Sequence, residues 1–516
     1  MLLGNLLTKN VRRHPDKHAL IFGNTKYSFS QLNKRVNSLV NALSAMGVNK
    51  GDKVALLADD CPEYLEMQWA AAKSGIVIVP LNRMIGGRDL TYTINNSEAN
   101  TLFLGANYLE SVNSIRQELK SVDKFICIGQ EVKEVEDYEK LISSHPPNEP
   151  EVEMKEDDLY TITYTSGTTG LPKGVMLTHK NFMASAADGV ILYRLEEKDI
   201  MLNLFPYYSA ALPWIMTSCF YIGASYVGVE RFDPKVILET IEREKVTAVY
   251  FAAPMLIPFL DYSDIDKYDL SSLRIVHHSG APIPVETVKK ALRIFGPKLR
   301  TVLGSTECIF FTFLPPEEYV LEGPAEKVKR LASCGKEAIN SEVRIVDDEG
   351  KDVPPGDIGE IITRADYLMK GYWKMPEATA EAIKGGYLYT GDMATMDDEG
   401  YIYLSDRKKD MITTGGKTVV PREVEEIIYR HPSVLEAAVI GMPDEKLGEA
   451  VKAIVVLREG KGATQEELVG LCRQNLAEHA VPKCIEFIDK LPRSPMHKVL
   501  RKTLREKYGN PCESGG

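Results

Sequence analysis

The 516-residue sequence lacks any pair of closely spaced cysteines. A zinc cluster needs cysteine or histidine ligands at short, regular spacings, so the pattern argues against one. Scattered cysteines also suit a reducing compartment, and we expect all of them to be free thiols. The eight cysteines are Cys61, Cys127, Cys219, Cys308, Cys334, Cys472, Cys484 and Cys512.

Positive charge is in deficit, with 62 Lys and Arg against 73 Asp and Glu and a net charge of −11. Proteins that bind nucleic acid need a basic face, so this balance argues against that class. The leucines among the first seven residues form too short an apolar run before Lys9 and Arg12, so we expect no signal peptide. We predict a cytoplasmic protein of about two to four domains.

Residues 200–229 contain no charged side chain at all. The segment is long enough to cross a bilayer. However, Asn203, Pro206 and Pro213 interrupt it, and polar groups in lipid would need internal partners. We therefore interpret it as a buried region that lines a hydrophobic pocket, with a membrane span as the alternative.

Residues 164–175 combine three glycines, four hydroxyls and one lysine. Glycine lets a backbone approach a ligand closely, and hydroxyls and ammonium groups donate to anionic oxygens. The segment therefore reads as a phosphate-handling loop, with a polar surface turn as the alternative. It is not a P-loop, because Pro172 stands where that motif needs its second glycine. The alternation of Tyr160, Ile162 and Tyr164 with threonines predicts a strand just before it.

The order of elements predicts an α/β fold. Ser28 should cap an amphipathic helix, and apolar runs at 54–57 and 75–82 should form parallel strands around a helix at 63–73. Residues 130–158 read as an exposed connection. A second alternating block then runs to about residue 330.

Strand pairs with turn signals follow from residue 340 and predict a small β-rich subdomain. The chain ends in a compact αβ tail. We expect a large N-terminal domain, 1–407, with two doubly wound sheets and a small β-barrel-like subdomain, and a small α+β C-terminal domain, 408–516.

Five motifs occur in the order seen in adenylate-forming enzymes, and the chain resembles the acyl-CoA synthetases of that superfamily, which include fatty-acid and aryl or alicyclic carboxylate–CoA ligases. Residues 62–82 add to the resemblance, which covers the whole chain. It implies that a carboxylate and ATP form acyl-AMP and pyrophosphate, and that CoA then gives acyl-CoA and AMP, with Mg²⁺ as cofactor. The motifs lie at 164–175, 303–307, 388–392, 405–412 and 492–498.

The resemblance also implies site residues. Lys498 would be the catalytic lysine, Thr306 a contact of the α-phosphate, and Glu307 the Mg²⁺ ligand. Asp392 would hydrogen-bond the ribose, and Arg407 the ribose or a phosphate. The remaining ATP- or AMP-binding candidates are Thr165, Ser166, Gly167, Thr168, Thr169, Gly170, Lys173, Gly280, Ala281, Pro282, Leu303, Gly304 and Ser305.

By the same resemblance, the C-terminal domain would be mobile about a hinge at Lys409 and would bring Gly415 and Gly416 towards the CoA tunnel. The acyl pocket should lack a buried cation, which favours an uncharged cyclic, aromatic or medium-chain acid. Its candidate residues are Tyr208, Ser209, Ala210, Trp214, Cys308 and Phe310.

The sequence departs from the family pattern in four places. Leu303 replaces the adenine-stacking tyrosine, Ser209 replaces a histidine of the acyl-entry region, and His497 replaces a glycine. Thr418 and Val420 replace an asparagine and a tyrosine. Two alternatives therefore stay open: an acyl-AMP ligase that loads a carrier protein, and a non-catalytic nucleotide-sensing protein. A homodimer is compatible with either.

Overall fold

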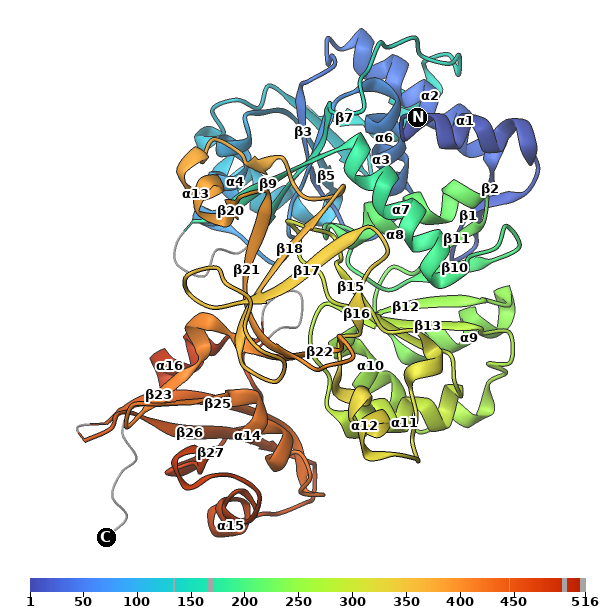
Figure 1. Ribbon diagram of the computed structural model, residues 1–516. Coiled ribbons are helices and arrows are strands. Elements are labelled where there is room, and N and C mark those ends of the chain that lie inside the picture. Colours follow the sequence, from blue (N-terminus) through green and yellow to red (C-terminus); the bar gives the residue numbers. More distant parts are fainter. Residues whose placement is uncertain (133–134, 166–170, 445, 494–498, 511–516) are drawn as a thin grey trace.

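The computed structural model describes residues 1–132, 135–165, 171–444, 446–493 and 499–510. In Figure 1 the first large sheet lies at the top of the molecule, the second large sheet at the right, the half-barrel sheet in the middle and the C-terminal α+β region at the lower left. This architecture confirms the expected fold class.

The first large sheet is eight-stranded and mostly parallel, in the order β19-β9-β8-β4-β3-β5-β6-β7. The predicted strand–helix–strand unit is confirmed, because β3 and β4 pair in parallel on either side of α3 (Pro62–Ser74). The antiparallel hairpin β8–β9 carries the glycine-rich loop. The strands are β3 (Lys53–Leu57), β4 (Val77–Pro80), β5 (Ala99–Gly105), β6 (Lys124–Ile128), β7 (Glu136–Asp137), β8 (Leu159–Thr165), β9 (Lys173–Thr178) and β19 (Gly371–Tyr372).

The second large sheet is seven-stranded, in the order β14-β13-β12-β10-β11-β1-β2. The two neighbouring strands at one edge, β1 and β2, come from the N-terminus, and β1 pairs in parallel with β11 some 200 residues later. The second alternating block predicted up to about residue 330 thus shares its sheet with strands from the N-terminus. The strands are β1 (His18–Phe22), β2 (Thr25–Ser28), β10 (Ile200–Asn203), β11 (Ser225–Gly228), β12 (Ala248–Ala252), β13 (Ile275–Ser279) and β14 (Leu299–Val302).

Helix α2 (Phe29–Ala45) begins where the sequence predicted. The Ser28 hydroxyl accepts from the Gln31 amide, and the Gln31 side chain accepts from the Ser28 amide, which is a complete capping box. The other α-helices of the first 400 residues are α1 (Gly4–Arg13), α4 (Gly87–Ser97), α5 (Leu109–Ile115), α6 (Tyr138–Ser143), α7 (His179–Tyr193), α8 (Ala211–Ile222), α9 (Pro234–Glu244), α10 (Ala253–Leu260), α11 (Val285–Phe295), α12 (Ala325–Lys329) and α13 (Pro376–Ala382).

The connection at 130–158 is less exposed than predicted. It contains α6, whose Tyr138 is fully buried and donates a hydrogen bond to Glu66. Further on, Glu149 lies 2.6 Å from the ammonium group of Lys73, which is buried against α2. Acidic composition suggested solvent exposure, but these carboxylates and hydroxyls have partners on the helices they cover.

The uncharged segment 200–229 forms β10, α8 and β11 inside the second sheet layer, which confirms that it is buried; that it lines a hydrophobic pocket stays a prediction. In the part of the chain that the structure covers, every helix is too short or too polar to span a bilayer. Six cysteines are free thiols as predicted, but Cys484 is disulfide-bonded, because separation in sequence does not report proximity in space. Cys512 lies outside the described residues.

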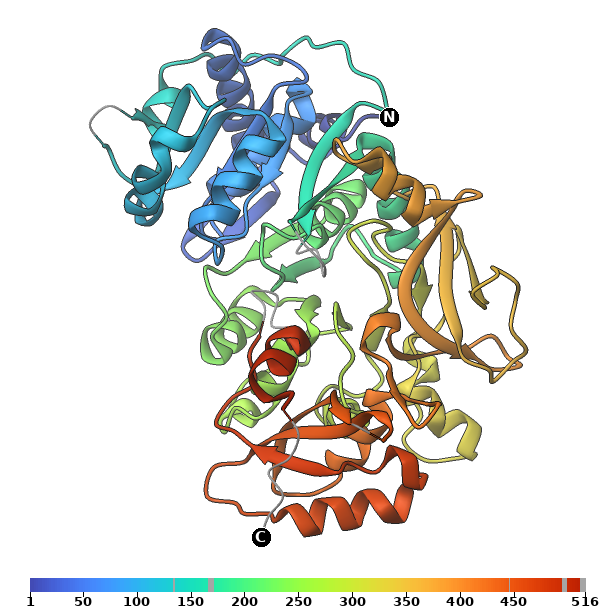
Figure 2. The ribbon, with the colours of Figure 1, turned by 90° about the vertical axis from the view of Figure 1, so that its left-hand side faces the viewer.

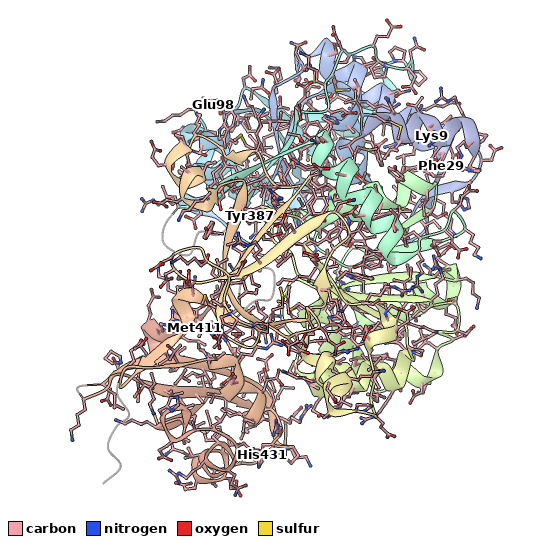
Figure 3. The ribbon with its side chains drawn as sticks, viewed as in Figure 1. Lys9, Phe29, Glu98, Tyr387, Met411 and His431 are labelled. Carbon is pink, nitrogen blue, oxygen red and sulfur yellow. The ribbon has the colours of Figure 1, made fainter. Side chains whose placement is uncertain are left out.

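The β-rich subdomain is an antiparallel half-barrel in which β21 pairs with β18, β20 and β22. The long β21–β22 hairpin ends beside the C-terminal region, and Figure 3 shows Tyr387 on this sheet and Met411 where the C-terminal region begins. The strands are β17 (Ser341–Val346), β18 (Gly359–Ala365), β20 (Ile383–Lys384), β21 (Tyr387–Met396) and β22 (Ile402–Arg407); β15 (Thr312–Phe313) and β16 (Lys336–Glu337) pair separately.

The C-terminal region has its own five-stranded sheet and its own apolar core, drawn from residues 412–485. It lies below the rest of the molecule in Figure 2. Its elements are β23 (Ile412–Thr414), β24 (Lys417–Val419), α14 (Pro421–Ile428), β25 (Val434–Asp444), β26 (Gly448–Leu457), α15 (Gln465–Asn475), β27 (Cys484–Phe487) and α16 (Arg501–Tyr508).

Candidate active site

A cavity of about 730 Å³ lies where the second sheet, the β21–β22 hairpin and the C-terminal region meet. Gly280 directly follows β13 and Leu303 directly follows β14, and the carboxyl ends of neighbouring parallel strands meet at one edge of a sheet. The structure therefore brings together residues that lie far apart in the sequence. Seven predicted nucleotide-binding residues line the cavity: Gly280, Ala281, Pro282, Leu303, Gly304, Asp392 and Arg407.

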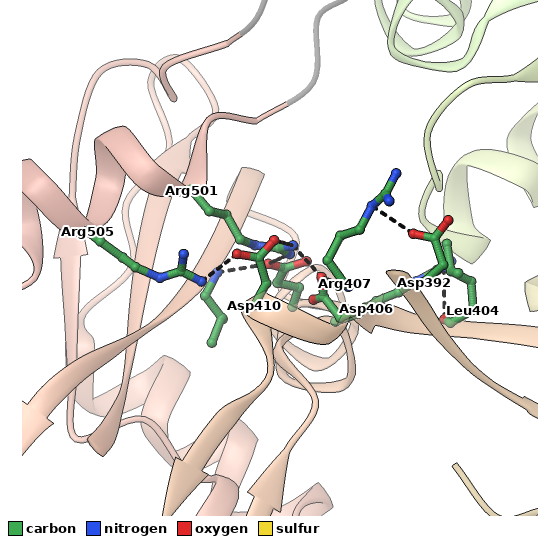
Figure 4. Close-up of polar contacts among 10 residues, drawn as sticks. Asp392, Leu404, Asp406, Arg407, Asp410, Arg501 and Arg505 are labelled. Atoms are coloured by element: carbon green, nitrogen blue, oxygen red, sulfur yellow. Dashed lines mark hydrogen bonds and ion pairs between the residues drawn. The ribbon is translucent and has the colours of Figure 1, made fainter. Parts of the chain in front are cut away.

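Asp392 and Arg407 are Cα partners in the β21–β22 ladder. The Arg407 Nε lies 2.7 Å from the Asp392 Oδ1, and an Arg407 terminal nitrogen donates to the Thr390 carbonyl at 3.0 Å (Figure 4). Asp392 is 6% exposed, whereas the Arg407 side chain is 44% exposed. The pair thus presents a buried two-oxygen acceptor and an accessible guanidinium to one ligand space.

Close packing requires a glycine at position 304. A Cβ at this position would lie 2.0 Å from the Ile309 carbonyl oxygen, so the tight loop after β14 admits only glycine. Leu303 is anchored on both sides, because its amide donates to the Thr312 hydroxyl and its carbonyl accepts from the Phe311 amide. Its aliphatic side chain gives the cavity an apolar wall without an aromatic face.

Glu307 and Lys173 meet at a residue that the sequence analysis missed, Tyr372. The Tyr372 hydroxyl donates to Glu307 Oε1 at 2.9 Å, and the Lys173 ammonium lies 4.9 Å from the centre of the Tyr372 ring. Burial, with the neighbouring Glu307 carboxylate, raises the pKa of Tyr372, so this hydroxyl keeps its proton. No periodicity or motif spacing marked Tyr372, because it reaches Glu307 only through the pairing of β19 with β9.

A magnesium ion fits this chemistry. Mg²⁺ in nucleotide enzymes is held by one or two carboxylates and by phosphate oxygens, and Glu307 supplies a carboxylate. Within the described ranges, no group of three or more His, Cys, Asp or Glu side chains could hold a metal by itself, so protein ligands alone would not suffice there.

For the glycine-rich loop and the predicted catalytic lysine, the structure describes only the residues on either side. Thr165 and Lys173 are Cα partners at the loop end of the β8–β9 hairpin. Arg493, within the last motif, and Val499, directly after it, line the cavity. The predicted residues Ser166, Gly167, Thr168, Thr169, Gly170 and Lys498 lie outside the described residues.

The turn residues between the cavity and Glu307 are half-buried. The Ser305 hydroxyl accepts from the Cys308 amide at 3.3 Å, which shapes the turn that carries Thr306. Neither Thr306 nor Glu307 lines the 730 Å³ cavity. The structure thus separates a nucleoside-sized space from the Glu307–Tyr372–Lys173 group.

The predicted acyl residues lie beside this site in a packed aromatic cluster. The rings of Trp214 and Phe310 are 5.1 Å apart, and Cys308 and Phe310 are fully buried. Ser209 donates to the Pro206 carbonyl. None of the six predicted acyl residues, which include Tyr208 and Ala210, lines the 730 Å³ cavity, so an acyl pocket here stays a prediction.

The hinge and tunnel candidates lie away from the cavity. Lys409 is exposed, in a single 3₁₀ turn between β22 and β23. Gly415 and Gly416 form the two-residue turn of the β23–β24 hairpin, both with positive φ, which explains the glycine pair structurally. Neither glycine lines the cavity.

Two further residues, neither of them among the predicted nucleotide-binding residues, also line the cavity. His278 and Tyr319 line its apolar end, with the Tyr319 hydroxyl 3.3 Å from His278 Nε2. Burial lowers the pKa of His278 to about 4, so the imidazole is neutral at physiological pH.

Comparisons with known proteins agree with this arrangement. The family model for AMP-binding enzymes matches residues 7–373, and the model for the AMP-binding enzyme C-terminal domain matches residues 423–498. A putative acyl-CoA synthetase of Bacillus subtilis, YngI, is 34% identical over 98% of this chain and 96% of its own length. A feruloyl-CoA synthase of an Amycolatopsis species is also 34% identical, over 98% of this chain and 99% of its own.

Among solved structures, the anthranilate CoA ligase AuaEII in complex with anthranoyl-AMP superposes with a TM-score of 0.91 at 28% identity, covering 98% of this chain and 97% of the ligase. The chain therefore belongs to the AMP-binding enzyme family, the adenylate-forming superfamily. Within it, the chain belongs to the acyl-CoA synthetases and ligases.

Proposed function

We propose that the protein is an ATP-dependent acyl-CoA synthetase that makes an acyl-adenylate and then an acyl-CoA. The observation that carries the proposal is the convergence of the β13 and β14 loops, Asp392 and Arg407 on one cavity of nucleoside-binding size. The relatives named acyl-CoA synthetase and CoA ligase over nearly the full chain support the same reaction.

In the first half-reaction, a carboxylate oxygen attacks the α-phosphorus of ATP and pyrophosphate leaves. Both reactants are anions, so the protein must orient them and neutralise charge. Asp392 would accept from the ribose hydroxyls, and Arg407 would donate to the ribose or a phosphate. Lys498 would contact the carboxylate and the α-phosphate, because an ammonium on a flexible stem can reach both.

Lys173 and the glycine-rich loop would hold the leaving pyrophosphate. Glu307 would hold Mg²⁺, oriented by the Tyr372 hydroxyl, and the ion would neutralise phosphate charge. The Lys173 ammonium, packed on the Tyr372 ring, adds positive charge at the same place.

The second half-reaction needs the C-terminal region to turn about Lys409. In the structure, Arg493, Val499 and Arg501 line the cavity, whereas Gly415 and Gly416 do not. This arrangement suits adenylation. Rotation of a region with its own core, residues 412–485, would then bring the glycine turn to the site for attack by the CoA thiol.

For the acid, we propose an uncharged cyclic, aromatic or medium-chain carboxylate. Trp214 and Phe310 are buried aromatic groups beside the cavity, and the nearby Arg83 is already paired with Asp60 at 3.3 Å. The relatives named feruloyl-CoA synthase and anthranilate CoA ligase act, by those names, on aromatic acids.

The test is pyrophosphate exchange with ATP across a broad panel of acids, followed by assay for thioester with CoA. We expect exchange with uncharged acids and its loss in Lys498→Ala, with AMP binding retained. No exchange with any acid would overturn the enzyme assignment. Acyl-AMP that accumulates in the presence of CoA would instead favour the loading of a carrier protein.

A further inference from the structure

Arg501, the first residue of α16, connects the C-terminal helix to the β21–β22 hairpin. One terminal nitrogen lies 2.6 Å from Asp406 at the end of β22, and the other lies 2.7 Å from Glu425 on α14 (Figure 4). The N–H donors of a guanidinium lie in one plane along its edges, so its two terminal nitrogens can bridge two carboxylates that a lysine could not hold in this geometry.

The contact is largely buried. The side chains of Asp406, Glu425 and Arg501 are 5%, 13% and 19% exposed. Removal of one partner from a buried ion pair strongly lowers the stability of the fold, because the remaining charge stays where water solvates it poorly.

A second pair reinforces the first. Asp410, 9% exposed, lies 2.5 Å from Arg505, which is about one turn after Arg501 on α16, and 4.0 Å from Arg501 itself. Asp406 and Asp410 stand on either side of Lys409, so α16 is tied to the chain both before and after the predicted hinge.

The network is not saturated. Asp406 Oδ2 and Arg501 Nε are buried, and among the described residues neither atom has a hydrogen-bond partner. A contact with unused donors and acceptors costs less to give up than a complete one, which suits a contact that is made in one state and released in another.

Two features connect the Asp406–Arg501 contact with the adenylation half-reaction. Arg501 lies three positions after Lys498 in the sequence, and the side chains of Arg501 and Asp406 both line the 730 Å³ cavity. Rotation about Lys409 would separate Asp406, which precedes the hinge, from Arg501, whereas Glu425 and Arg501 would move together.

We propose that Arg501 is a positioning residue. Its ion pair with Asp406 holds α16, and with it the chain that follows Lys498, at the nucleotide cavity during adenylation. The ion pair then breaks before thioester formation. We call the Asp406–Arg501 contact the latch. The inference rests on the proposed function, because it assigns the latch to one of the two half-reactions.

The half-reactions can be measured separately in the full-length protein. In Arg501→Gln, we expect pyrophosphate exchange to fall about tenfold or more, within the usual range of conformational coupling. Thioester formation from supplied acyl-AMP and CoA should fall less than about threefold. Asp406→Asn should act in the same direction, and the double variant should be no worse than the more affected single variant, because both remove one contact.

Lys483→Gln is the matched control. It breaks an ion pair with Asp444 that lies wholly within the C-terminal region. We expect it to leave the ratio of the two half-reactions unchanged. If Arg501→Gln and Asp406→Asn lowered both half-reactions equally, Arg501 would be merely structural and the proposal would fail.

Hydrogen exchange of backbone amides gives a readout that needs no substrate. Arg501→Gln and Asp406→Asn should speed exchange at residues 404–411 and 499–508, whereas Lys483→Gln should not. Unchanged amide exchange at these residues in both variants would contradict the proposed role of the latch. If the wild type catalysed neither half-reaction, the proposed function would fail, and this measurement would still decide whether the latch closes.

Discussion

Arg407 and Asp392 are ion-paired across the β21–β22 hairpin, with 2.7 Å between Arg407 Nε and Asp392 Oδ1. The ion pair and the strand ladder together hold the carboxylate, so a nucleotide would meet an aspartate whose position is already set. Preorganised groups of this kind bind more tightly because less ordering is needed on binding.

Removal of either partner should weaken nucleotide binding. A hydrogen bond to a charged group contributes about 1.5–3 kcal/mol, so Asp392→Asn and Arg407→Gln should each raise the Kd for AMP roughly tenfold to a hundredfold. Isothermal titration calorimetry measures this directly. Asp398→Asn, at the exposed tip of the same hairpin, is the control. Equal affinity of Asp392→Asn and the wild type would exclude Asp392 as a ribose contact.

An aromatic ring at position 303 should strengthen nucleotide binding. Leu303 lines the cavity but offers no face on which adenine can stack. Aromatic pairs gain about 0.5–1.5 kcal/mol beyond burial, so Leu303→Tyr should lower the Kd for AMP about two- to tenfold. Leu303→Ile controls for a change of shape alone. Weaker binding by Leu303→Tyr would show that adenine does not lie against this wall.

Loss of the Tyr372 hydroxyl should raise the requirement for Mg²⁺. Tyr372→Phe keeps the ring under Lys173 but removes the hydrogen bond to Glu307. A net loss of about 1 kcal/mol would raise the Mg²⁺ concentration for half-maximal pyrophosphate exchange about fivefold. A magnesium titration of the variant gives the answer. Tyr387→Phe, on the half-barrel sheet, removes a similar hydroxyl far from the site and should change nothing.

Asp60 should make the stability of the protein depend on pH. Burial raises the pKa of Asp60 from its ordinary 3.8 to about 6, against the opposing effect of Arg83 and of the Tyr207 amide, which donates to it. The folded state therefore holds this proton more tightly than the unfolded chain. The stabilising contribution is complete below the unfolded pKa and is lost as pH rises through about 6.

Asp60→Asn has no such proton, so its free energy of unfolding should rise relative to that of the wild type between about pH 4 and pH 7. Over this range, the difference in the free energy of unfolding between the variant and the wild type should grow by about 2–3 kcal/mol. Urea unfolding at several pH values measures it. A gap that is constant across this range, or that shrinks, would contradict the prediction.

The sequence by itself determined the local elements and the membership of the family. The Ser28 capping box, the strand–helix–strand unit at 53–80 and the β-rich block after residue 340 follow from patterns that span a few residues, and they are present as predicted. The resemblance to the family likewise identified seven residues that line one cavity. Roles of individual residues, the hinge and the acyl pocket stay predictions.

Only the tertiary structure decided which distant segments meet. β1 joins the second sheet, α6 covers α2, Tyr372 reaches Glu307, and Arg501 bridges Asp406 and Glu425. The reason is physical: hydrophobic period and capping report the local backbone, whereas sheet order and buried ion pairs depend on which surfaces must be covered when the whole chain packs. No pattern within one segment carries that information.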